Sequence, residues 1–405
     1  MRTSRGKLTA HSTSVIFAAV SLTLLLAVAA ACGGDGDNQD GDGASATPQL
    51  TVGAQLQVLD SVRILRDEND LYFNLEDVSA DGRQLLFLAF APLSGSGCGN
   101  LVRLALDGQL TTLAKDASQA NFGLPAGHAL FSPQGDRVAY LAAEDCAKRD
   151  LATLRVVTIA TGETAKAADE ASRVWSWTSE GKILFDRGAV ADSVVWEVSA
   201  DGSALRQVAT RHAVDVSQDG RLLVYVESGP TVVFDAGAGS ALRTTGTPPD
   251  LERRFLSPDG RRYVSAVLDK NTEFDRLELY DLDSGAVSGA IALDQLRSLN
   301  AGPPFRAAWS SDSAAFFFQG TPHSGDAPPP AYALGPDGGV LAKLTIEGGA
   351  LAYDLTSRGP LVFYRSGNDI WVAILTGEGI APEQPEALKT SIRNSFPAPV
   401  PLAMQ

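Results

Sequence analysis

The sequence has few of the side chains that enzymes most often use at their active sites. It contains only 4 histidines and 3 cysteines, and no Gly-x-Ser-x-Gly segment. His128, His212 and His323 stand apart from one another, at none of the spacings that hold a metal ion. A serine peptidase of the prolyl-oligopeptidase kind needs that pentapeptide for its nucleophile, so a fused peptidase is excluded. We expect no catalytic residue, no metal and no cofactor.

Positive charge is also scarce. Lysine and arginine together number 33 against 48 aspartates and glutamates, which gives a formal net charge of −15 at pH 7. An acidic chain of this kind repels the phosphates of nucleic acids and anionic lipid headgroups. Nucleic acid is therefore not an expected partner, and the acidity by itself favours solubility rather than a particular ligand.

One apolar run stands out, at the N-terminus. Residues 15–31 (VIFAAVSLTLLLAVAAA) follow the basic residues Arg2, Arg5 and Lys7 and directly precede Cys32. A basic start, an apolar centre and small residues before a cysteine resemble the signal peptide of bacterial lipoproteins. The resemblance implies that residues 1–31 are removed and that the sulfur of Cys32 receives a diacylglycerol. An uncleaved membrane anchor and an ordinary secretory signal remain alternatives.

The segment after the cysteine has the composition of a tether. Residues 32–49 consist mainly of Gly, Asp, Asn and other small or polar residues, which cannot bury apolar area. Several acyl chains, at roughly 0.8 kcal/mol per CH₂ group, would hold such a protein on a membrane almost permanently. We expect an exported protein, lipid-anchored to a bacterial membrane, with the outer membrane favoured, on its periplasmic or surface side.

A polar turn recurs seven times along the rest of the chain. It has the form Ser-x-Asp-Gly-Arg and is followed by an apolar run, and the glycines (Ser313 in one copy) are 39 to 53 residues apart. The Ser and Asp side chains can accept hydrogen bonds from nearby N–H groups, and glycine supplies the positive φ that closes a hairpin. The copies lie at Ser79–Arg83, Ser132–Asp136, Thr178–Lys182, Ser217–Arg221, Ser257–Arg261, Ser310–Ser313 and Thr356–Gly359.

A second turn follows in every unit, after another apolar strand. Apolar strands without polar alternation are typical of strands buried on both faces. We therefore predict an all-β fold, a seven-bladed β-propeller of four-stranded antiparallel blades over residues 50–380, followed by a Pro-rich C-terminal tail over 381–405. A propeller must close, so we expect a strand within residues 55–59 or 61–66 to complete the last blade, and the tail to run over the surface.

The best copy of the turn, Ser257-Pro258-Asp259-Gly260-Arg261, resembles the TolB-type WD40-like propeller repeat. The resemblance covers about residues 70–377 and implies the propeller fold. It implies no particular function, because such repeats occur in scaffolds, in translocation factors and as domains attached to peptidases.

Two cysteines fall at equivalent places in the first two units. Cys98 and Cys146 each lie in the loop before the third strand, and these loops are among the longest. In an oxidising compartment we expect a Cys98–Cys146 disulfide, which needs a Cα separation of roughly 4.4 to 6.8 Å. Two unpaired thiols are the alternative.

The loops between second and third strands differ most in length from unit to unit, and in a propeller they all emerge on one face. Insertions on one face of a repeat scaffold often mark its binding surface, although neutral drift in loop length is an alternative. We expect a non-catalytic scaffold that binds an envelope protein or an extended peptide on this face. A lactonase- or hydrolase-type enzyme with a site at the central channel, and a carbohydrate- or cell-wall-binding protein, are the alternatives. In a functional interpretation, Trp175, Trp177 and Trp309 would be stacking platforms for sugars or peptides at the channel, but core packing is the favoured interpretation.

Overall fold

The computed structural model describes the chain from Leu56 to Leu402, with gaps that fall mostly between strands. Residues 1–55 and 403–405 lie outside the described part, so the signal peptide, the tether and lipidation of Cys32 stay predictions. Within the described ranges, no helix is long and apolar enough to cross a membrane. The gaps are residues 68–71, 91–97, 119–128, 146–151, 190–192, 210–212, 214, 218–219, 227–230, 237, 246–255, 269–273, 293, 296–301, 311–312, 322–330, 336, 338, 345–351, 359, 367–368, 378–379 and 381.

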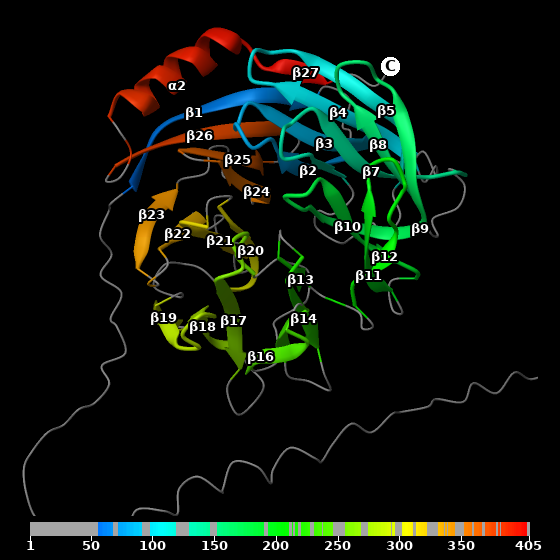
Figure 1. Cartoon of the computed structure of the whole chain (residues 1–405). Helices are drawn as coiled ribbons and strands as arrows, with labels where there is room; N and C mark the ends of the chain where they lie inside the picture. Colours follow the sequence, from blue (N-terminus) through cyan, green and yellow to red (C-terminus); the bar gives the residue numbers. More distant parts are fainter. Residues whose placement is uncertain are drawn as a thin grey trace, which may run out of the picture. The chain divides into compact units, whose positions relative to one another are not determined.

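The first three groups of strands form one continuous sheet (Figure 1). It is continuous because β9 pairs with β8 through its first half and with β10 through its second half, and because Ala117 of β5 pairs with Ala142 of β7. Its strands are β2 (Tyr72–Val78), β3 (Gln84–Phe90), β4 (Cys98–Ala105), β5 (Leu110–Ser118), β6 (Ala129–Phe131), β7 (Arg137–Ala142), β8 (Ala152–Thr158), β9 (Thr164–Trp177), β10 (Lys182–Arg187), β11 (Val194–Ser199) and β12 (Arg206–Gln207).

Three smaller antiparallel sheets follow along the chain. The first has the order β13-β14-β15-β16, the second β17-β18-β19 and the third β20-β21-β22-β23. Their bounds are β13 (Asp215–Val216), β14 (Leu222–Val226), β15 (Thr231–Asp235), β16 (Ser240–Thr245), β17 (Arg262–Leu268), β18 (Phe274–Asp281), β19 (Val287–Ala292), β20 (Gly302–Trp309), β21 (Phe316–Thr321), β22 (Ala331–Leu334) and β23 (Val340–Leu344).

The last sheet, which we call the closing sheet, joins the two ends of the chain. Its order is β24-β25-β26-β1-β27, so the first strand of the fold pairs with the last strands. The expected closing strand is confirmed, and both candidate segments belong to it as one strand antiparallel to β26. The bounds are β24 (Ala352–Arg358), β25 (Leu361–Ser366), β26 (Asp369–Gly377), β1 (Leu56–Asp67) and β27 (Val400–Leu402).

The sheets follow one another around a ring. Strand β2 contacts both β24 and β6, β9 contacts both β6 and β13, and β20 contacts β24. A hydrogen bond from the Leu256 N–H to Asp215 and another from the Asp259 N–H to Ser313 join the remaining neighbours. The predicted all-β antiparallel propeller is thereby confirmed. The count of seven blades stays a prediction, because three strand groups share one sheet.

The core lies between neighbouring sheets. Phe316, Phe317 and Phe318 follow one another on β21, and each is at most 2% exposed. Phe316 and Phe318 belong to a cluster with Tyr263 of β17, whereas Phe317 belongs to a cluster with Val362 of the closing sheet. Successive side chains of a strand point to opposite faces, so this apolar run fills both of the interfaces that its sheet makes.

The C-terminal segment differs from the expected surface tail. Residues Glu383–Ser395 form helix α2, and β27 adds to the closing sheet in parallel to β1. Ile392, Phe396 and Leu402 are buried in the same cluster as residues of β1. Burial of these three apolar side chains against β1 explains why the segment forms a helix and a strand and not an irregular tail.

Candidate functional site

The blades have two ends of different character. In an antiparallel blade the hairpin after the first strand and the hairpin after the third strand lie at the same end. Hydrogen bonds between the two turns confirm this, for example Leu106 N to Arg83 O (2.8 Å) and Leu282 N to Arg261 O (2.8 Å). We call this end the turn face, and we call the opposite end, which carries the connections between second and third strands, the loop face.

The serine of the repeated turn is a structural residue. Ser79 is 1% exposed; its Oγ donates to Asp81 Oδ1 (2.6 Å) and accepts from the Gln84 N–H (2.9 Å). Burial raises the pKa of Asp81, but the hydrogen bonds from Ser79 Oγ and the Arg83 N–H outweigh it and leave that pKa lowered. Ser257 makes the same two bonds, at 2.6 and 2.9 Å. The polar atoms of these turns are thus occupied in closing the hairpin.

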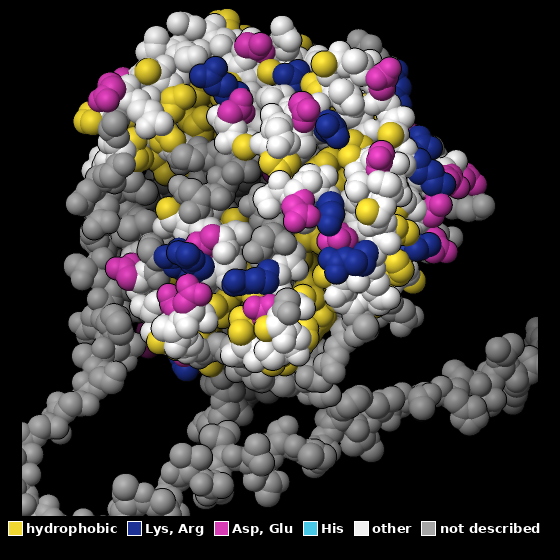
Figure 2. Space-filling view, in the orientation of Figure 1, with side chains coloured by type: hydrophobic (Ala, Val, Ile, Leu, Met, Phe, Trp, Pro, Cys, Tyr) yellow, Lys and Arg dark blue, Asp and Glu magenta, His cyan; other side chains and the backbone are white. Residues whose placement is uncertain are grey.

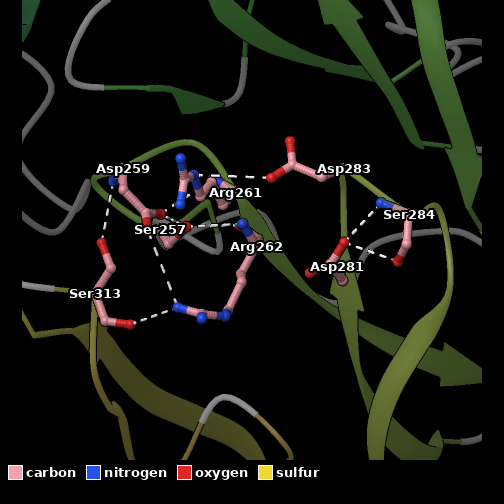
Figure 3. Close-up of polar contacts among 8 residues, drawn as sticks. All are labelled: Ser257, Asp259, Arg261, Arg262, Asp281, Asp283, Ser284 and Ser313. Atoms are coloured by element: carbon pink, nitrogen blue, oxygen red, sulfur yellow. Dashed lines mark hydrogen bonds and ion pairs between the residues drawn. The ribbon is translucent and has the colours of Figure 1, made fainter.

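The turns also join neighbouring sheets, as Figure 3 shows for the fifth and sixth copies. The Asp259 N–H donates to Ser313 Oγ (3.0 Å), and Arg262 Nη1 donates to Ser313 O (2.9 Å). Gln84 holds the place of Arg262 in the first copy, and its Nε2 donates to Gly135 O (3.4 Å). Ser313 therefore occupies the turn position that is glycine in other copies, with a φ of 60°. Its hydroxyl accepts the hydrogen bond that joins the two sheets.

A second kind of hydrogen bond between neighbouring sheets, from a backbone N–H to an aspartate, was not predicted from the sequence. Asp77 Oδ2 accepts from the Phe131 N–H (2.8 Å), and Asp215 Oδ2 accepts from the Leu256 N–H (2.8 Å). Each aspartate lies two residues before the serine of its turn, and each N–H lies one residue before the serine of the next turn. An aspartate that recurs two residues before the serine of the turn was the sequence signal that could have predicted this contact.

The three tryptophans before the turns are buried. Trp175, Trp177 and Trp309 are 1%, 4% and 6% exposed. The Trp175 Nε1–H donates to Asp186 (2.6 Å), and the Trp177 Nε1–H donates to the Leu130 carbonyl (3.2 Å). The core-packing interpretation is confirmed for these residues.

The loop face is where the blades differ. Between strands, the turn-face connections keep nearly the same form, whereas the loop-face connections range from residues 367–368 in the closing sheet to 143–151 and 322–330 elsewhere. The serine and glycine chemistry above fixes the geometry of the turn face. Most connections there span four to six residues, whereas the loop-face connections span two to nine, so the larger variation in length falls on the loop face.

The loop ends of the first two blades are braced against each other. Asp116 of β5 forms an ion pair with Arg155 of β8 at 2.6 Å, and its backbone carbonyl accepts from the Ala143 N–H at 2.8 Å. The Tyr140 hydroxyl donates to the same carboxylate at 3.2 Å. Burial, with the nearby charge of Asp116, raises the pKa of Tyr140 to about 12, so this hydroxyl is a donor at neutral pH.

The cysteine expectation concerns the same region. Cys98 begins β4 opposite Ser118 and takes part in a disulfide. Cys146 lies outside the described residues, so its pairing with Cys98 stays a prediction. Across the described ranges, no group of three His, Cys, Asp or Glu side chains is arranged to hold a metal ion.

The surface in view has no large area of one charge. Figure 2 shows basic and acidic side chains next to one another, with hydrophobic atoms scattered between them. Among the described residues, the exposed large hydrophobic ones are Leu205, Leu242 and Val287.

No protein-family model matches the sequence, and neither does any curated protein sequence. Among solved structures, TolB from Acinetobacter baumannii is similar, with 12% identity over 73% of this chain and 64% of that chain and a TM-score of 0.41. A structure from a study of two prolyl endopeptidases has 17% identity over 73% of this chain and 45% of that chain, with a TM-score of 0.46. The match thus spans less than two thirds of either structure.

Proposed function

We propose that this protein is a bacterial lipoprotein, anchored through Cys32, whose propeller is a non-catalytic scaffold in the cell envelope. It binds an envelope protein or an extended peptide on the loop face. The observation that carries the proposal is the contrast between the two faces: one is uniform and internally bonded, and the other varies from blade to blade.

Polar side chains of the turn face are engaged in hydrogen bonds within the protein. The hydroxyls of Ser79, Ser257 and Ser313 and the carboxylate of Asp81 are held by bonds that close the turns or join the blades. Recruiting them for a ligand would break those bonds. Loops on a rigid scaffold carry no such constraint, which is why binding residues are so often found there.

The loop face also has a firm base. The Asp116–Arg155 pair and the Asp116–Ala143 bond hold the loop ends of the first two blades together, and the predicted Cys98–Cys146 disulfide would add a covalent link. Loops fixed at their ends lose less conformational entropy when a partner binds, which favours affinity. Trp175, Trp177 and Trp309 are buried, so these three residues are not stacking platforms for a ligand.

Photo-crosslinking in the native cell tests this function. A photoreactive amino acid replaces Ala189, in the loop-face connection after β10, or Ala80, in the first turn; both alanines are exposed. We expect an adduct of defined mass from position 189 and none from position 80, with the partner identified by mass spectrometry. Adducts from both positions alike, or from position 80 alone, would contradict loop-face binding. Turnover of lactone or ester substrates by the purified protein would contradict a non-catalytic role.

A further inference from the structure

The closing sheet fixes the face at which the chain enters the propeller. Leu56, the first residue of β1, lies opposite Gly377 at the end of β26, whereas Arg66 lies opposite Asp369 at its start. Gly377 belongs to the second turn of its blade, and the Leu375 N–H bonds the Pro360 carbonyl of the first turn. The chain therefore enters at the turn face and runs along β1 toward the loop face.

The C-terminal strand runs the same way. Strand β27 is parallel to β1, with Val400 opposite Leu65 and Leu402 opposite Asp67. Leu402 thus lies at the loop-face end of β1. The two ends of the described chain leave the propeller at opposite faces.

We propose that this register orients the protein on its membrane, with the turn face toward the bilayer and the loop face away from it. The inference rests on the proposed anchor at Cys32 and adds to it a direction: the variable loops are presented to partners on the far side.

The dimensions set how strongly the point of chain entry biases the orientation. A chain of random-coil dimensions with the length of residues 33–55 would have a root-mean-square span of about 24–29 Å, at 5–6 Å times the square root of its length. A seven-residue strand such as β3 is ~23 Å long at 3.3 Å per residue. Since Leu56 lies at the turn face, the loop face is roughly a strand length farther than the turn face from the point where the chain enters.

Charge does not compete with this arrangement. On the turn face, Lys182 Nζ lies 3.1 Å from Glu180, and Arg261 Nε lies 3.7 Å from Asp283, the second pair being drawn in Figure 3. Neighbouring charges of opposite sign largely cancel at a distance, so the face has no strong attraction for anionic headgroups. The point of chain entry, and not electrostatics, then sets the orientation, which should be insensitive to salt.

Fluorescence quenching by headgroup-bound nitroxide tests the orientation. Full-length lipidated protein carrying Ala80→Cys or Ala189→Cys is labelled without reductant and reconstituted into phosphatidylethanolamine–phosphatidylglycerol vesicles that contain the nitroxide lipid. We expect quenching at position 80 to exceed that at position 189 at least twofold, at both low and high salt.

Equal quenching at the two positions, stronger quenching at position 189, or a ratio that collapses at high salt would overturn the orientation while leaving the anchor intact. Vesicle flotation of the same samples separates the two failures. Protein that does not float, or a Cys32→Ser variant that floats as well as its parent, would overturn the anchor and the orientation together.

Discussion

Arg393 of helix α2 holds Asp60 of the closing strand with two hydrogen bonds, 2.7 Å from Nε and 2.6 Å from Nη2. The two residues are 333 positions apart in sequence. The Asp60 side chain is only 14% exposed, so the C-terminal segment supplies the partner of a carboxylate that is largely removed from water. This pair ties the end of the chain to the strand that closes the ring.

Replacing Arg393 should loosen that closure. Arg393→Ala leaves Asp60 without this bidentate partner, and we expect a loss of about 1 kcal/mol in the free energy of unfolding, because Arg393 is itself more than half exposed. Chemical denaturation checks the value. Lys389→Ala is the comparison variant: its pair with Glu386 is exposed and long at 3.5 Å, and its charge acts on Asp60 without a hydrogen bond, so it should cost less. An equal loss would contradict a special role for Arg393.

The same pair predicts a pH dependence. The hydrogen bond from Arg393 lowers the pKa of Asp60 below its ordinary value of 3.8, against an opposing effect of burial. A carboxylate whose folded-state pKa is depressed stabilises the fold above its unfolded-state pKa, and this contribution is lost as the pH falls through the folded-state pKa. The stability difference between wild type and Asp60→Asn should therefore be constant from pH 7 to 5 and shrink below pH 3.8. Urea titrations at several pH values measure it, and a difference that grows on acidification would refute the assignment.

The aspartate that links the fourth and fifth strand groups should matter more than a surface acid. Asp215 is 2% exposed and accepts from the N–H groups of Leu256 and Val216. Asp215→Ala leaves these donors without that acceptor and should lower the free energy of unfolding by about 2–3 kcal/mol. Asp215→Asn keeps a carbonyl acceptor and should cost clearly less. Equal losses in the two variants would show that the charge, or the second carboxylate oxygen, is responsible, because asparagine keeps the volume of aspartate and one carbonyl acceptor.

Two turn glycines provide a matched test of space against backbone conformation. Gly162 and Gly220 have nearly the same positive φ, 70° and 72°. A Cβ at residue 162 would meet nothing within 4 Å, whereas a Cβ at residue 220 would lie 2.5 Å from Cδ1 of the buried Leu184. Alanine at either site should cost about 1–2 kcal/mol for the left-handed backbone, and Gly220→Ala should cost a further ~1–3 kcal/mol for the clash. Thermal unfolding of the two variants compares them, and identical transitions would count against the packing described for Leu184.

The disulfide of Cys98 should have Cys146 as its partner. Non-reducing peptide mapping of exported protein should yield one Cys98–Cys146 linked peptide, and the double serine variant should be less stable by about 2–4 kcal/mol. Recovery of Cys146 as a free, alkylatable thiol would rule the pairing out.

The turns were predictable from sequence because their chemistry is local. Gly82, Gly135 and Gly260 all have φ between 67° and 70°, as the Ser-x-Asp-Gly pattern requires. The burial of Phe316–Phe318 on both faces of the sheet was also predictable, because apolar residues there do not alternate with polar ones. Such features depend on a few adjacent residues, so a single sequence contains the necessary information.

The contacts between distant residues were not predictable in this way. Helix α2 was hidden by a proline-rich composition, although Pro385 lies in its first turn, where proline is tolerated, and acidic residues precede Arg393 in the order that a helix dipole favours. The hydrogen bond from the Phe131 N–H to the Asp77 carboxylate depends on two blades being adjacent. Only the assembled ring shows what that carboxylate does. The residues that touch a partner depend on loop conformations, which local patterns leave undetermined.

The pairing of β1 with β26 also has a consequence for how the protein is made. Synthesis proceeds from the N-terminus, so β1 emerges first, yet the strand that receives it is completed only some three hundred residues later. At roughly 5–20 residues per second this is a wait of about 15–60 seconds, during which the apolar residues of β1 that the fold buries, such as Ile64 and Leu65, have no native neighbour. Contacts of such long sequence separation also slow folding itself. A newly made molecule therefore exposes its first strand to aggregation for longer than any other, and a factor that shields nascent chains should act there first.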